Sequence, residues 1–301
     1  MSTRFFSLAA SALVLAACST FSSAPAPVEA AAPAFSSDRF SVVASGEGEP
    51  IVFVPGLASS PRAFEGVTDD LPGSVHLVTV AGFGDTAAPA ELDPFVQPIA
   101  DELKRYLASE RATNAVLVGH SMGGVVAMLT AAQTERVGGV VIVDSVPFLS
   151  GFFQPGATPE QAAALRPAMA AQFAGMTDLQ WTLFARQGLM TQSISEEGRA
   201  RVSADSERAN VAAQQAAFID LMTNDYTEVF RMVDVPVLVL VPFDETAGLP
   251  KETILQRYEE QYADMPWVRI KMIEGSRHFI TFDQPEAFRE ALDAFLEGGS
   301  Q

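Results

Sequence analysis

Short runs of apolar residues recur along the chain between residues 50 and 273. They are rich in Val and nearly continuous rather than alternating with polar residues, which is typical of strands buried on both faces of a parallel sheet. The runs are PIVFVPG at 50–56, VHLVTV at 75–80, AVLVG at 115–119, VVIVD at 140–144, PVLVLVP at 236–242 and VRIKMI at 268–273. Helical spacing appears between them, for example at 95–109, 122–135 and 284–297. The alternation predicts an α/β fold, a mostly parallel open sheet with helices on both faces.

The alternation stops in the interval 147–233, which has no strand-like run and is rich in Ala, Gln, Met and Phe with helical spacing. We therefore predict a helical cap at 147–233, inserted into an α/β core formed by 39–146 and 234–301. One cap helix should begin at Thr158, because a first-turn proline follows it and Gln161 completes a capping box.

Apolar side chains of this cap could either form its own core or line a pocket above the site. Helical spacing favours the core, although both interpretations stay open. The residues are Phe152, Phe153, Met169, Phe173, Met176, Trp181, Phe184 and Met190.

Residues 1–18 have the pattern of an export signal. Arg4 is followed by SLAASALVLAAC, a short apolar segment with small residues before Cys18. The segment is too short to cross a bilayer of about 30 Å as a helix, so it predicts a removed secretory signal. The residues LAAC at 15–18 resemble the lipobox of bacterial lipoproteins, which implies a signal peptide at 1–17.

Cys18 is the only cysteine of the chain, which excludes an intramolecular disulfide. The lipoprotein resemblance implies that it is lipidated and becomes the first mature residue. Residues 18–38, rich in Ser, Ala and Pro, would then form a flexible tether to the bacterial cell envelope. Ser19 favours the outer membrane if the host has two membranes. The alternative is an ordinary signal peptide with an incidental cysteine.

Composition narrows the possible functions. With 301 residues and 48% hydrophobic residues, the chain can bury a large core. Its net charge of -18 would repel the phosphates of nucleic acids, so we exclude nucleic acid as a partner. One cysteine, three scattered histidines and the lack of a phosphate-binding Gly-Lys loop predict no metal and no cofactor.

The string AVLVGHSMGG at 115–124 places Ser121 in a Gly-x-Ser-x-Gly pentapeptide. The pentapeptide alone is a weak signal, but here it follows a buried-strand pattern and opens a helix pattern. A sharp turn of this kind holds a serine nucleophile in a strained conformation, and Gly119 and Gly123 leave room for close backbone approach. The backbone N–H of Met122, at the start of the helix, would face the oxyanion that forms when Ser121 attacks a carbonyl.

A serine nucleophile needs a base, usually a histidine. His120 lies beside the serine, where its side chain should point elsewhere, and His76 lies in an early strand. His278 follows the last predicted strand and precedes the C-terminal helix, so it should lie on a loop at the carboxyl edge of the sheet. We therefore predict His278 as the base.

Residues 40–297 resemble the capped subgroup of the α/β-hydrolase superfamily. GHSMGG is similar to its nucleophile elbow, GSRHFITFDQPEAF to its histidine loop and VAGFGDT to its glycine-rich turn after an early strand. The resemblance implies a second oxyanion donor after the first core strand, the backbone N–H of Leu57. Pro55 stands where family members commonly have histidine.

The resemblance also implies an acid that orients the histidine. It should follow the strand at 236–242, where Asp244 and Glu245 are both available, and we prefer Asp244. Asp144, at the end of VVIVD, is a third candidate because some relatives place the acid there. Asp283 and Asp85 are interpreted as capping or turn residues without chemistry.

These residues predict a serine hydrolase, a carboxylesterase that forms an acyl-enzyme on Ser121. The absence of an Arg or Lys cluster in the cap favours a small, apolar, uncharged ester or related carbonyl compound as substrate. One alternative is a related chemistry of the same triad, carbon–carbon bond hydrolysis or cofactor-free perhydrolysis. Another is a non-catalytic binding module of the cell envelope on the same fold.

Overall fold

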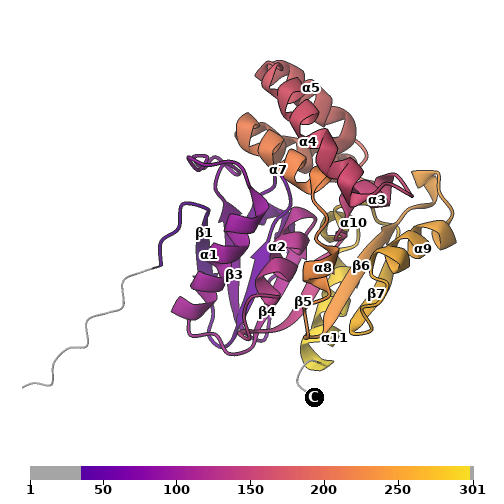
Figure 1. The fold of residues 1–301 in the computed structure, drawn as a ribbon. Coiled ribbons are helices and arrows are strands. Elements are labelled where there is room, and N and C mark those ends of the chain that lie inside the picture. Colours follow the sequence, from indigo (N-terminus) through magenta and orange to yellow (C-terminus); the bar gives the residue numbers. More distant parts are fainter. Residues whose placement is uncertain (1–34, 299–301) are drawn as a thin grey trace, which may run out of the picture. The chain divides into compact units, whose positions relative to one another are not determined.

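The computed structural model describes residues 35–298, and a seven-stranded sheet forms their centre (Figure 1). The strand order is β1-β3-β2-β4-β5-β6-β7; β1 is antiparallel to β3, and every other pair is parallel. The strands are β1 (Phe40–Ser45), β2 (Pro50–Val54), β3 (Ser74–Val80), β4 (Ala115–His120), β5 (Val137–Val143), β6 (Val237–Phe243) and β7 (Val268–Glu274). The mostly parallel α/β sheet predicted from the sequence is confirmed.

Each face of the sheet has its own hydrophobic core. In β2, Val52 and Val54 pack into one core with α1 (Val96–Ser109) and α2 (Met122–Ala131), whereas Ile51 and Phe53 pack into the other with α11 (Pro285–Gly298). Figure 1 shows α1 and α2 in front of the sheet and α11 behind it. Because successive strand residues point to opposite faces, a strand covered by helices on both sides must be apolar throughout.

The strands at the two edges depart from this rule. β7 alternates between less and more exposed residues, although its sequence suggested continuous burial. β1 has no counterpart among the predicted strands, since apart from Phe40 its residues are partly or fully exposed. An edge strand has a neighbour on one side only, so its sequence carries a weaker apolar signal.

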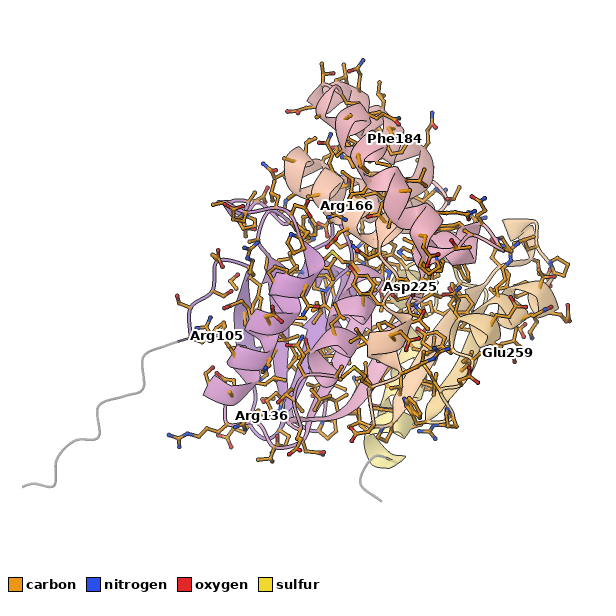
Figure 2. The ribbon with its side chains drawn as sticks, in the orientation of Figure 1. Arg105, Arg136, Arg166, Phe184, Asp225 and Glu259 are labelled. Atoms are coloured by element: carbon orange, nitrogen blue, oxygen red, sulfur yellow. The ribbon has the colours of Figure 1, made fainter. Side chains whose placement is uncertain are left out.

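Six helices lie between β5 and β6, where the sequence predicted the inserted cap. They are α3 (Leu149–Phe153), α4 (Pro159–Ala174), α5 (Asp178–Leu189), α6 (Glu196–Glu207), α7 (Val211–Thr223) and α8 (Thr227–Phe230). The helix start at Thr158 is confirmed, with both hydrogen bonds of the capping box to Gln161 present. Phe173, Trp181, Phe184 and Phe218 pack into an aromatic cluster within the cap, and Figure 2 labels Phe184.

A buried carboxylate ties the cap to the core. Asp220 of α7, only 1% exposed, accepts the backbone N–H groups of Phe95 and Val96 at the start of α1, over 3.0 and 2.9 Å. A carboxylate is favourable at this position because the first N–H groups of a helix lack partners within the helix. Arg166 of α4, labelled in Figure 2, donates to the other oxygen of Asp220.

The predicted signal peptide, Cys18 and most of the tether lie outside the described residues and stay predictions. Within residues 35–298, no helix combines the length and apolar character that a membrane crossing requires.

Candidate active site

Ser121 lies at the turn between β4 and α2 in a strained backbone conformation, with φ 53° and ψ -120°. Its N–H donates to the carbonyl of Val143, and its own carbonyl accepts from Gly124. A serine with positive φ costs free energy and persists only where its surroundings hold it there. The sharp strand-to-helix turn predicted from GHSMGG is therefore present, with the serine at its tip.

His278 follows β7, and its Nδ1 lies 2.6 Å from Oδ2 of Asp144. Asp144 follows β5 directly, and its side chain is 14% exposed. The hydroxyl of Tyr258, on α9 (Lys251–Gln261), donates to the other carboxylate oxygen of Asp144. Both oxygens of this carboxylate are thus engaged, which fixes its orientation toward the histidine.

The expected pairing of His278 with Asp244 is not found. Asp244 accepts instead from Nε of Arg277 at 2.7 Å and from the Thr246 hydroxyl at 2.6 Å. Glu245 is exposed in the short turn that follows. β5, β6 and β7 are neighbouring parallel strands whose carboxyl ends meet at one edge, so Asp144 and Asp244 both lie near the histidine loop. The loop after β7 decides which carboxylate pairs with the His278 imidazole. In this loop the side chain of Arg277 contacts Asp244, and the side chain of His278 contacts Asp144.

The electrostatics of the pair favour an ionised acid. Burial would raise the pKa of Asp144, but the charge of His278 and the hydrogen bonds from His278 and Tyr258 together lower it below its usual value. Burial and the neighbouring carboxylate raise the pKa of Tyr258 well above its usual value. At neutral pH an ionised Asp144 accepts from a protonated Tyr258 hydroxyl.

Leu57 and Met122, whose backbone N–H groups are the expected oxyanion donors, line one cavity together with Ser121. Met122 is the first residue of α2, so its N–H has no acceptor within the helix. The loop at Gly56 runs directly against the nucleophile turn: a Cβ at this position would lie 3.0 Å from Cβ of Ser121. A glycine is therefore needed at position 56, because a side chain there would keep the loop that carries Leu57 away from Ser121.

The cavity has a volume of about 820 Å³, within the range of small-molecule sites. Ser121, His278 and Asp144 line it together with residues of both core and cap. Two of the eight apolar cap residues named above, Phe152 and Phe153, line it as well. Within residues 35–298, no group of three or more His, Cys, Asp or Glu side chains could hold a metal ion.

His76 and Asp283 make contacts that do not involve Ser121. His76 is buried between the Tyr106 hydroxyl and the Ser74 hydroxyl. Asp283 accepts from the backbone N–H of Arg277, beside His278, and from Ser193 and Ile194 of the cap. It thus connects the histidine loop to the cap, which its position in the sequence did not indicate.

His120 has a contact that the sequence did not predict. It is 3% exposed, and its Nε2 lies 2.9 Å from the backbone carbonyl of His278, to which it donates. Its ring also packs on Phe279 with the centroids 4.5 Å apart. Burial, together with the charge of His278, lowers the pKa of His120 to about 3. His120 therefore stays neutral and joins the nucleophile turn to the histidine loop.

Replacing His120 should separate this hydrogen bond from simple packing. We expect His120→Phe to lower kcat about tenfold with little change in KM, because a hydrogen bond of this kind contributes about 1–1.5 kcal/mol. His120→Gln, which keeps a donor, should retain kcat within about threefold, since a threefold change is less than 1 kcal/mol. Steady-state kinetics on one ester test both variants, and a larger loss in His120→Gln than in His120→Phe would show that the ring volume matters and the hydrogen bond does not.

A serine nucleophile turn, with a histidine and a carboxylate supplied from the ends of neighbouring strands, defines the class of α/β hydrolases. The chain belongs to the alpha/beta hydrolase family, whose model matches residues 51–291.

Three individual proteins illustrate the similarity. The (E)-2-((N-methylformamido)methylene)succinate hydrolase of Acinetobacter baylyi is 23% identical over 256 residues, 84% of this chain and 92% of that protein. The pimeloyl-[acyl-carrier protein] methyl ester esterase of Aeromonas hydrophila is 24% identical over 262 residues, 85% and 98% of the two chains. The solved structure of an esterase from Exiguobacterium antarcticum has a TM-score of 0.68 at 20% identity, covering 86% of this chain and 95% of that one. The last likeness is one of fold.

Proposed function

We propose that the protein is a serine hydrolase, a carboxylesterase that acts through an acyl-enzyme on Ser121. The observation that carries the proposal is the His278–Asp144 pair, joined at 2.6 Å and lining the same cavity as the strained serine. An imidazole oriented by a carboxylate, in the same cavity as a serine held at positive φ, has a use in nucleophilic catalysis. The names of the two curated relatives, a hydrolase and a methyl ester esterase, support the same class of reaction.

In the proposed reaction the Ser121 hydroxyl attacks the ester carbonyl and gives its proton to Nε2 of His278. Asp144 holds Nδ1 and stabilises the imidazolium. The backbone N–H groups of Leu57 and Met122 stabilise the oxyanion. The imidazolium then protonates the leaving alcohol, and water hydrolyses the acyl-enzyme by the same steps.

A fluorophosphonate probe, which reacts with activated serines, tests the proposal by intact mass. We expect one adduct on the wild type, none on Ser121→Ala and strongly slowed labelling of His278→Ala. Ser145→Ala is the matched control, because Ser145 lines the same cavity and has no proposed role; this variant should label like the wild type. Absence of an adduct on the wild type would contradict the proposal and favour a non-catalytic binding module.

Turnover of simple esters distinguishes the proposed carboxylesterase from the related chemistries. An acid and an alcohol as products support ester hydrolysis. If the labelled enzyme leaves esters intact but cleaves a carbon–carbon bond or forms a peracid, the serine mechanism stands and the substrate class is corrected.

A further inference from the structure

Arg257 brings a positive charge to the cavity from outside the cap. It is on α9, next to the tyrosine that contacts Asp144, and its partly buried side chain lines the cavity of about 820 Å³. It also lines a second cavity of about 190 Å³ between α3 and α9. The uncharged substrate was expected from the residues of the cap alone, whereas this cation comes from a helix of the core.

The other charged side chains on the cavity wall are compensated. Asp144 is paired with His278, and Asp244 forms an ion pair with Arg277. Among the residues that the structure describes, the side chain of Arg257 forms neither an ion pair nor a hydrogen bond, so its guanidinium is the unmatched charge of this cavity.

The surroundings of Arg257 indicate where an anion would bind. Phe152, Ile254 and Leu249 also line the main cavity and give it apolar surface. Glu260 lines the smaller cavity, where its carboxylate accepts from Gln256 and disfavours a second anion. An anionic group is therefore expected on the main-cavity side of the guanidinium, whose fork of N–H donors matches a carboxylate.

We propose that Arg257 is a specificity-determining residue that binds a carboxylate of the substrate, at the end of an apolar chain whose ester group lies at Ser121. The inference rests on the proposed function and changes the expected substrate from a neutral ester to one with a single negative charge. It requires no further catalytic group, since the carboxylate is bound and not transformed.

Two ester series test the proposal, because the carboxylate could lie on either side of the ester bond. One comprises monomethyl esters of C4 to C8 dicarboxylic acids, and the other acetyl esters of hydroxycarboxylic acids of the same lengths. Neutral methyl esters of monocarboxylic acids serve as comparators. We expect Arg257→Met to lower kcat/KM for the best charged ester by about tenfold to a hundredfold, as for a hydrogen bond to a charged group, and to leave neutral esters and probe labelling unchanged.

Arg269→Met is the matched control. Arg269 is exposed near the amino end of β7, whereas the site lies at the carboxyl ends of the strands. The same change of charge should therefore have no effect there. Equal losses in the two variants, or no preference of the wild type for any charged ester over its neutral comparator, would overturn the proposal.

Binding to the inactive Ser121→Ala variant separates this inference from the proposed reaction. Calorimetry should detect the charged esters with Arg257 present and a clearly weaker affinity in Ser121→Ala/Arg257→Met. If wild type is not labelled by the probe but this difference persists, the hydrolase proposal fails and the anion site stands. If labelling occurs and the difference is missing, the anion site fails alone.

Discussion

Asp144→Asn should lower kcat by about three to four orders of magnitude, the size of effect seen when the acid of a serine triad becomes an amide. Asp144 Oδ2 accepts from His278 Nδ1 at 2.6 Å, and an amide in its place can present its NH2 group to that nitrogen. The ring would then adopt the wrong tautomer for taking the proton of Ser121. Steady-state kinetics on an ester measure the loss, and circular dichroism establishes that the variant is folded.

Asp244→Asn is the matched control, because both carboxylates line the cavity and follow neighbouring strands. Asp244 is paired with Arg277, whose side chain is 24% exposed, so water can solvate the guanidinium when the carboxylate is lost. Such a pair contributes on the order of 1 kcal/mol, which predicts a loss of less than about tenfold. A larger loss in Asp244→Asn than in Asp144→Asn would reverse the assignment of the acid.

Gly123→Ala should destabilise the fold by about 3 kcal/mol, the upper end of the effects of overpacking. A Cβ at this position would lie 2.0 Å from the carbonyl oxygen of Val54 and 2.8 Å from that of Pro55. Both are backbone atoms, so no rotamer change relieves the contact. Since this backbone leads into the Leu57 loop, we also expect probe labelling of Ser121 to be lost. Chemical denaturation and intact mass measure the two effects.

Gly188→Ala is the control for this substitution. Gly188 is in α5, and a Cβ there would meet no atom within 4 Å. Alanine is the better helix former, so the variant should be equally stable or more stable by up to about 1 kcal/mol. If Gly123→Ala unfolded at the same denaturant concentration as Gly188→Ala, the close approach of the two backbones would not exist in solution.

The elements that local sequence specifies were predicted well. The start of α4 follows from Thr158, its proline and Gln161, and the nucleophile turn follows from a buried strand joined to a glycine-flanked serine. Burial on both faces requires apolar residues throughout, so the central strands were visible as continuous runs. β1 was missed because an exposed edge strand does not need such a run.

Contacts between distant segments were less predictable. The preference for Asp244 came from its position after the strand at 236–242, yet three strand ends meet at the same edge and sequence order does not say which side chain faces the ring. The donor role of His120 and the unmatched charge of Arg257 likewise depend on residues far apart in the chain. No local pattern marks either residue.

The sequence by itself determined the α/β class, the inserted helical segment and the serine at its turn, because periodicity, capping and glycine spacing act over a few residues. Only the tertiary structure decided that Asp144 and not Asp244 contacts His278, and that a guanidinium from α9 lines the cavity. The physical reason is that hydrogen bonds and ion pairs depend on distances of about 3 Å between side chains, which the packing of strands and helices sets.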